Sequence, residues 1–133
     1  MQPMNNDTIE FSYGGFFQGY KTIRYSNGTV TLSISLKPDD EQTNNVPEER
    51  LEVFWQELET IGVWDWQDEY VDPYILDGVQ WSLKLVHGDR EKNISGSNMF
   101  PPNISVSDNP KGDVFHQLCQ AVNKLVGRKY FKY

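Results

Sequence analysis

The sequence predicts one α+β domain with two layers: an antiparallel sheet of about five strands, with two helices on one face. Two segments carry apolar residues at helical spacing, and the segments around them alternate apolar and polar residues as strands do. Their order along the chain is β-β-β-α-β-β-α. A chain of 133 residues fits a single domain, residues 1–133. We expect a compact core over residues 8–127 and frayed tails at 1–7 and 128–133.

Three strands are predicted in the first part of the chain. Residues 8–13 alternate and end at two glycines. Asn27-Gly28 then separates two β-rich runs, which predicts a hairpin with a type I′ turn, because that turn needs positive φ at both central residues. The second run reads as a half-buried antiparallel strand. Its apolar face comprises Val30, Leu32, Ile34 and Leu36.

A polar loop over residues 37–46 leads to the first predicted helix. Pro47 suits the first turn of a helix, and Gly62 suits its end. The apolar residues between them share one helical face: Leu51, Phe54, Trp55, Leu58 and Ile61. Residues 63–77 contain a proline and show no sustained periodicity, so we expect an ordered loop there.

The remaining elements are a hairpin and a second helix. Residues 79–86 alternate, and the run REKNIS at 90–95 pairs back with them after a His-Gly-Asp turn. A turn-rich connection follows, in which we expect Gly96 and Asn98 to adopt positive φ. The last helix is predicted to run from Asp113, its N-cap, to Gly127. Its apolar face comprises Phe115, Leu118, Cys119, Val122, Leu125 and Val126.

The composition favours a globular protein of the cytoplasm. The chain is 38% hydrophobic and 14% aromatic, which is too rich in core-forming residues for a disordered protein. No apolar run approaches the roughly 20 residues of a membrane span, and the N-terminal residues lack the pattern of a signal peptide. Cys119 is the only cysteine, which excludes an intrachain disulfide and fits a reducing compartment.

Charge is distributed unevenly along the chain. The net charge is −7, yet residues 51–83 hold eight acids and no Lys or Arg, so that segment carries −8 and the rest carries +1. An acidic surface repels nucleic acid and attracts basic partners or cations. The basic end, residues 125–133, interleaves cations with aromatics as nucleic-acid-binding segments do, but a frayed or strand-pairing tail is the simpler interpretation. We expect a basic protein partner and no nucleic acid or membrane.

The second half of the chain resembles a family of small uncharacterised bacterial domains. The motifs that carry the resemblance are a G-V-W-x-W loop at residues 62–66, a D-G-x-x-W strand at 77–81, a G-D turn at 88–89 and an S-G-x-N-x-F-P turn at 95–101. The resemblance spans roughly residues 8–127 and is densest over 54–102. The family has no established activity, so it implies one compact domain and no catalytic residues.

The acidic loop admits two kinds of chemistry. Carboxylates at Asp65, Asp68, Glu69 and Asp72 are ligands that Ca²⁺ accepts, although the EF-hand spacing is absent. Trp64 and Trp66 beside these acids also have the composition of a glycosidase site, where two carboxylates act on a sugar stacked on aromatic rings. A solvated acidic loop explains the same residues without a ligand, and we predict no metal site.

The remaining reactive side chains fit structural roles. His116 and Cys119 lie three residues apart on the last helix, as a nucleophilic pair would, but Cys119 falls on the apolar face. His87 in the hairpin turn has no partner that the sequence identifies. The chain lacks nucleotide-binding glycine motifs and the G-x-S-x-G serine elbow, so we predict no cofactor and no catalytic residues.

These observations predict a non-catalytic cytoplasmic domain that binds a basic protein, as immunity-type proteins bind toxins. The predicted contact residues are Trp64, Asp65, Trp66, Asp68, Glu69, Tyr70 and Tyr74, because interfaces favour Trp and Tyr anchors and acidic rims attract basic partners. The alternative is a small-ligand or glycan-binding domain, with a Trp-lined pocket between helices and sheet and weak enzymatic activity. We expect both indoles to cover the open end of the core, with Asp65, Asp68 and Glu69 around them in water.

Overall fold

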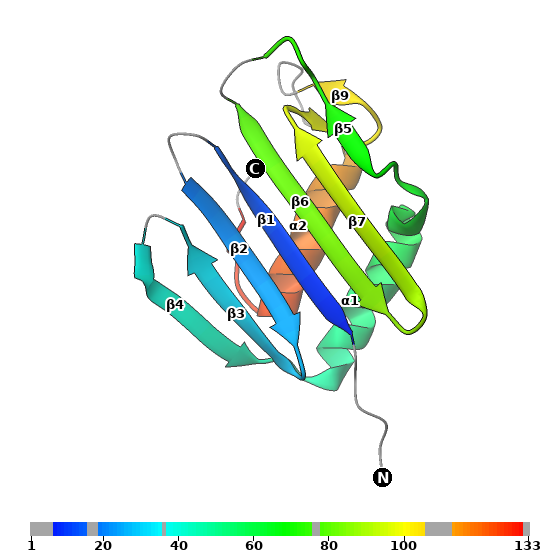
Figure 1. Cartoon of the computed structure of the whole chain (residues 1–133). Helices are drawn as coiled ribbons and strands as arrows, with labels where there is room; N and C mark the ends of the chain where they lie inside the picture. Colours follow the sequence, from blue (N-terminus) through cyan, green and yellow to red (C-terminus); the bar gives the residue numbers. More distant parts are fainter. Residues whose placement is uncertain (1–6, 16–18, 36, 76–77, 106–112, 132–133) are drawn as a thin grey trace.

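The computed structural model describes residues 7–15, 19–35, 37–75, 78–105 and 113–131. It has an α+β architecture in which two helices cover one face of a seven-stranded sheet of order β4-β3-β2-β1-β6-β7-β5 (Figure 1). The elements are β1 (Thr8–Gly15), β2 (Gly19–Ser26), β3 (Thr29–Ile34), β4 (Lys37–Asn45), α1 (Glu48–Ile61), the 3₁₀ helix η1 (Val63–Asp65), β5 (Glu69–Val71), β6 (Val79–His87), β7 (Arg90–Ser97), β8 (Met99–Phe100), β9 (Ile104–Ser105) and α2 (Asp113–Val126).

The predicted fold class is confirmed, but the predicted strand number and order are wrong. The sheet gains β4 and β5 from segments predicted as loops, and β8 and β9 form a separate two-stranded sheet. Strand β4 is an edge strand that pairs with β3 through its backbone, which requires no apolar side chains. Strand β5 has three residues and pairs parallel with β7, so it is too short to show a period of two.

The predicted hairpin is confirmed at its turn and along its strands. Asn27 and Gly28 have φ of 51° and 84°, as a type I′ turn requires. The Gly28 amide donates to the hydroxyl of Tyr25 at 3.2 Å, and burial raises the pKa of that hydroxyl. Val30 and Leu32 are fully buried as predicted, while Leu36 lies outside the described residues.

Both predicted helices are present, and they pack against each other behind the sheet (Figure 1). Helix α1 ends at Gly62, whose φ of 77° lets its amide donate to the carbonyls of Leu58 and Glu59. Helix α2 begins at Asp113, as predicted, and Gly127 follows it with φ of 81°. Among the described residues, no helix is long and apolar enough to cross a bilayer.

Phe115 is the aromatic side chain that seats α2 on the sheet. It is fully buried, and its ring lies 6.2 Å from Phe11 on β1, 4.9 Å from Trp81 on β6 and 4.6 Å from Phe100 on β8, measured between ring centroids. Tilted ring pairs at these separations each stabilise a fold by about 1 kcal/mol beyond the burial of their area. The hydrophobic core lies between the sheet and both helices, and Phe115 stands at its α2 side.

Positive φ was predicted at two residues near the end of β7, and the structure confirms it for Asn98 but not for Gly96. Asn98 has φ of 60°, as expected, and its side chain joins the neighbouring loop by accepting from the Val79 amide and donating to the Ile75 carbonyl. Gly96 does not have positive φ. The Trp81 indole packs directly against the Gly96 backbone, and a Cβ at residue 96 would lie 2.0 Å from its Nε1 atom. Glycine is required there because any larger side chain would clash with the indole.

The predicted frayed tails are wrong where the structure describes them. Tyr130 and Phe131 are only 6% and 1% exposed. The side-chain oxygen of Asn123 accepts from both of their amides, and its nitrogen donates to the Phe131 carbonyl. At the other end, the Asp7 carboxylate is bonded to α1 and β6. Tyr130 and Phe131 of the basic end therefore belong to the core.

Substitution Gly96→Ala should lower the free energy of unfolding by about 2–3 kcal/mol, because the new methyl group displaces the Trp81 indole and breaks its bond to the Met99 carbonyl. Urea unfolding followed by circular dichroism measures this change. Ser95→Ala on the same strand is the control and should change stability by less than about 0.5 kcal/mol, since Ser95 is exposed. Equal free energies of unfolding for the two variants would contradict the close packing of the Trp81 indole on Gly96.

Candidate functional site

The acidic loop of the sequence lies at one edge of the sheet, beside β7. The side chains of Asp65, Asp68 and Glu69 are exposed there, and we call these three residues the acidic edge. The indoles of Trp64 and Trp66 are half-buried and pack against the hydrophobic core. The predicted arrangement of indoles over the core and acids in water is therefore confirmed.

Trp64 belongs to a stack of four side chains. The centroid of its ring lies 6.1 Å from that of Trp55 on α1, and the guanidinium carbon of Arg90 lies over the Trp64 ring, 4.0 Å from its centroid. His87 stacks on Trp55 at 4.2 Å. The Asp7 carboxylate accepts from Trp55 Nε1 at 2.8 Å and lies 3.1 Å from His87 Nδ1. His87, for which the sequence indicated no partner, thus helps to hold the acidic edge in place.

Lys92 connects the acidic edge to β7. Its side chain is only 16% exposed, and its ammonium group donates to the main-chain carbonyl of Trp66. The same ammonium lies 3.1 Å from the carboxylate of Asp68, which is 82% exposed. Because an ion pair with one exposed partner contributes little to stability, the bond to the Trp66 carbonyl is the more important of the two. Sequence reasoning missed Lys92, since it lies far along the chain from the loop.

The two predicted tyrosines have different environments. Tyr70 is 4% exposed, stacks 6.1 Å from Trp81 and accepts from the Gln67 amide through its hydroxyl. It anchors the segment and is not a surface contact, which corrects that part of the prediction. Tyr74, in contrast, is 93% exposed. Asp72 is structural, because its carboxylate accepts from the Tyr74 amide at 3.0 Å and from the Ser105 hydroxyl at 2.5 Å.

The structure also locates the reactive residues of α2 and the four acids considered as metal ligands. Cys119 is 1% exposed within the core, as predicted, whereas His116 is exposed. Asp65, Asp68, Glu69 and Asp72 do not form a metal-binding group, and no cluster of three or more His, Cys, Asp or Glu side chains with that geometry occurs among the described residues.

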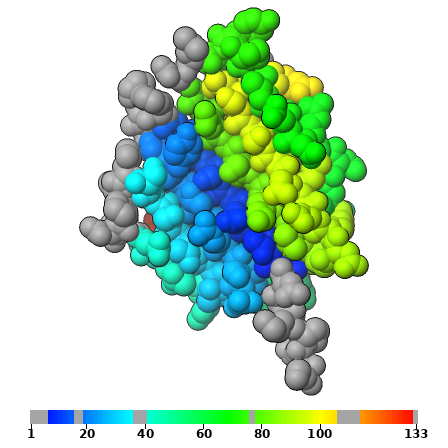
Figure 2. Space-filling model, in the orientation of Figure 1, coloured from blue at the N-terminus to red at the C-terminus, as the bar shows by residue number. Residues whose placement is uncertain are grey.

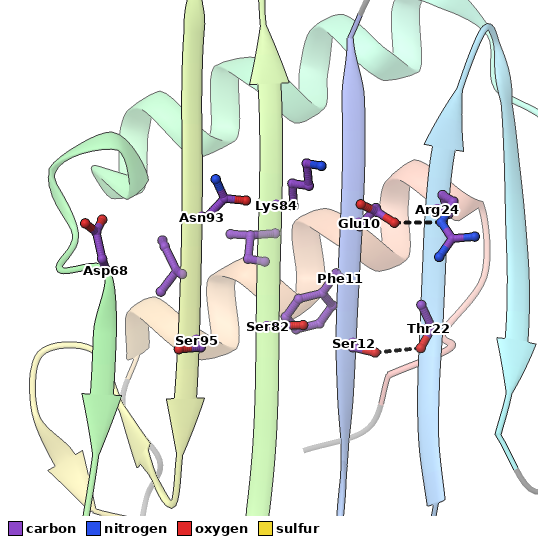
Figure 3. Close-up of a pocket in the computed structure, with 12 residues that line it drawn as sticks. Glu10, Phe11, Ser12, Thr22, Arg24, Asp68, Ser82, Lys84, Asn93 and Ser95 are labelled. Atoms are coloured by element: carbon purple, nitrogen blue, oxygen red, sulfur yellow. Dashed lines mark hydrogen bonds and ion pairs between the residues drawn. The ribbon is translucent and has the colours of Figure 1, made fainter.

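The face of the sheet opposite the helices is open, and it carries a second candidate site that the sequence reasoning missed. Figure 2 shows the central strands of this face with no helix over them. A hollow of about 510 Å³ crosses β2, β1, β6 and β7, with Asp68 at its edge (Figure 3). An adjoining hollow of about 380 Å³ reaches Glu69 and Gln80. Trp64 and Trp66 line neither of them.

No protein-family model matches this sequence, and a search of curated proteins gave no significant match. The described surface has two features that could serve a function. One is the acidic edge, held by aromatic packing and by Lys92. The other is the hollowed open face of the sheet, which meets the acidic edge at Asp68 and Glu69.

Substitution Lys92→Met should loosen the acidic edge without unfolding the domain. Methionine keeps the apolar stem but loses the bond to the Trp66 carbonyl, so we expect the free energy of unfolding to fall by about 1–2 kcal/mol. Amides of residues 66–70 should exchange with deuterium faster than in the wild type. Lys84→Met, on the exposed face of the adjacent strand, is the control. If both variants leave exchange at 66–70 unchanged, Lys92 does not hold the segment.

Proposed function

We propose that this domain is a non-catalytic protein-binding module whose acidic edge binds a basic protein partner in the cytoplasm, in the manner of immunity-type proteins. The observation that carries the proposal is the exposure of three carboxylates within five residues of chain, on a segment whose aromatic residues are packed into the core. Such a segment presents charge to a partner from a fixed backbone. The buried single cysteine, Cys119, agrees with a reducing compartment.

The acidic edge retains uncompensated charge in the folded protein. Cations from other elements pair with some acids of the segment 51–83: Arg90 with Glu59, Lys124 with Glu57, and Lys92 with Asp68. Asp65 and Glu69 form no ion pair with the described residues. Two of the three carboxylates of the acidic edge therefore keep a charge that no described cation pairs with, and this charge would steer a basic partner and raise its association rate.

Pre-organisation supports the same function. The segment is fixed at one end by the Trp64 stack and at the other by Tyr70 against Trp81. A partner that binds a fixed segment does not have to order it, so less of the interaction free energy is spent on conformational entropy. Tyr74, which is 93% exposed, and Val71, which is 42% exposed, offer apolar contact near the charged residues.

The triple variant Asp65→Asn, Asp68→Asn, Glu69→Gln should lose the partner. We expect immobilised wild-type domain to retain a basic protein from native lysate at low salt, and the triple variant to retain at least about tenfold less of it, because complementary charges across interfaces contribute substantially to binding. Quantitative mass spectrometry of the eluates measures the difference. Raising the salt concentration should release the partner from the wild type, since exposed charges are screened.

A matched variant separates the acidic edge from net charge alone. Glu41→Gln, Glu52→Gln, Asp89→Asn removes the same three charges from exposed positions on β4, α1 and the β6–β7 turn. This variant should retain the partner as the wild type does. Equal loss from both triple variants, or equal retention by all three proteins, would contradict a specific role for the acidic edge.

A further inference from the structure

The open face of the sheet carries a row of short hydroxyl side chains across four neighbouring strands. The strand register places Thr22 of β2 opposite Ser12 of β1, Ser12 opposite Ser82 of β6, and Ser82 opposite Ser95 of β7. All four line the larger hollow, and Ser82 and Ser95 also line the adjoining one (Figure 3). We call the two hollows together the hydroxyl trough. Because neighbouring strands lie about 4.8 Å apart, its floor is about 14 Å long.

Longer side chains in the two flanking rows form the walls of the hydroxyl trough. On one side stand Arg24, Glu10, Lys84 and Asn93, in register across the same four strands. On the other side the Tyr20 hydroxyl donates to the side-chain oxygen of Gln80 at 3.3 Å. Gly14 lies between these two residues in the register and has no side chain, and a Cβ there would lie 2.2 Å from the Gly19 carbonyl oxygen. The hollow therefore follows from side-chain size on a regular sheet.

The charges around the hydroxyl trough compensate one another. Arg24 pairs with Glu10 at 2.6 Å, and Asp68 pairs at 3.1 Å with Lys92, which does not itself line the trough. The two remaining charges that line the trough are of opposite sign, Lys84 and Glu69. A balanced lining gives no preference for an anion or for a cation. This separates the trough from the acidic edge, although the two surfaces meet at Asp68 and Glu69.

The floor and walls of the hydroxyl trough offer both hydrogen-bond donors and hydrogen-bond acceptors. The Ser12 and Thr22 hydroxyls bond each other at 2.6 Å, which leaves this pair one hydrogen to donate and three acceptor positions. The hydroxyls of Ser82 and Ser95 can each donate one hydrogen and accept two, and the amides of Asn93 and Gln80 donate and accept as well. An apolar ligand would leave these groups without water and without partners, which costs about 1–3 kcal/mol for each group. The volume of the larger hollow, about 510 Å³, lies within the range of small-ligand sites.

We infer that the hydroxyl trough binds an uncharged polyhydroxylated ligand, a short oligosaccharide that lies across the strands. Its hydroxyl groups match the donor and acceptor pattern of the floor, and its lack of charge matches the balanced lining. The wall pair of Tyr20 and Gln80 contacts one side of the sugar chain, and Asn93 with the Arg24–Glu10 pair contacts the other. This inference is independent of the protein-binding proposal, because it rests on the floor hydroxyls.

Titration of the 133-residue chain with neutral oligosaccharides tests the inference. The probes are tetrasaccharides of β-linked glucose, α-linked glucose, β-linked xylose and N-acetylglucosamine, followed by ¹H–¹⁵N correlation spectra. We expect at least one probe to give saturable shifts at millimolar concentration or below, centred on the amides of Ser12, Ser82 and Ser95. Binding should persist at high salt, unlike capture by the acidic edge.

Two variants and a control locate the site. Ser82→Trp fills the floor and should weaken binding by at least about tenfold. The double variant Ser12→Ala, Thr22→Val removes two floor hydroxyls, leaves the hollow open and should weaken binding several-fold. Thr43→Trp places the same bulk on β4, outside the trough, and should bind as the wild type does. Urea unfolding checks that each variant is folded.

Three results would overturn the inference. The first is that none of the four tetrasaccharides gives saturable shifts. The second is that binding survives in folded Ser82→Trp. The third is that a lysine-rich peptide or a sulfated oligosaccharide binds the trough more tightly than every neutral probe, because the recognition would then depend on charge.

Discussion

Phe115 packs helix α2 against the central strand β1 and its neighbour β6, and the aromatic packing that reaches the acidic edge starts at this contact. Its ring touches Phe11 and Tyr13 on the central strand, and Trp81 on the neighbouring strand β6. Trp81 in turn stacks on Tyr70, which lies in the middle of β5. A continuous line of aromatic packing therefore runs from the middle of the core to the strand that carries Glu69.

The acidic edge combines two requirements that usually conflict, because carboxylates prefer water and tryptophans prefer the core. The chain meets both by alternating them: Trp64 and Trp66 face the core, while Asp65 between them faces water. Packing on one side fixes the backbone, and exposure on the other side preserves the charge. The same one-sided burial operates over the whole sheet. Helices cover one face, and the other face presents a row of short hydroxyl side chains between a charged row and the uncharged pair of Tyr20 and Gln80.

Local sequence patterns predicted those parts of the fold that depend on neighbours in the chain. The alternation of Val30 and Leu32, the Asn27-Gly28 turn and the apolar face of α1 each arise within a few residues, and each is confirmed. Strand β5 was missed because three residues show no period, and β4 because its polar sequence reads as a loop. The contact of His87 with Trp55 and Asp7 was beyond prediction, since it joins residues up to 80 positions apart.

The hydroxyl trough illustrates the same limit in a candidate site. Ser12, Thr22, Ser82 and Ser95 are unremarkable individually, because polar residues are expected on the solvent face of an antiparallel strand. They form a row only through the register of four strands, which no local pattern specifies. The acidic edge, in contrast, was predictable from charge alone, although the roles of Tyr70 and Lys92 within it required the structure.

Thiol labelling tests the central claim, which is that the sheet is buried on one face and open on the other. The native protein has one cysteine, Cys119, which is 1% exposed behind the sheet. A single added thiol, Ser82→Cys, would stand on the open face. Under native conditions a thiol reagent should label the Ser82→Cys variant once and rapidly, and should leave the wild type unlabelled until it unfolds. A slow reaction of the introduced thiol, or rapid labelling of the wild type, would contradict the account.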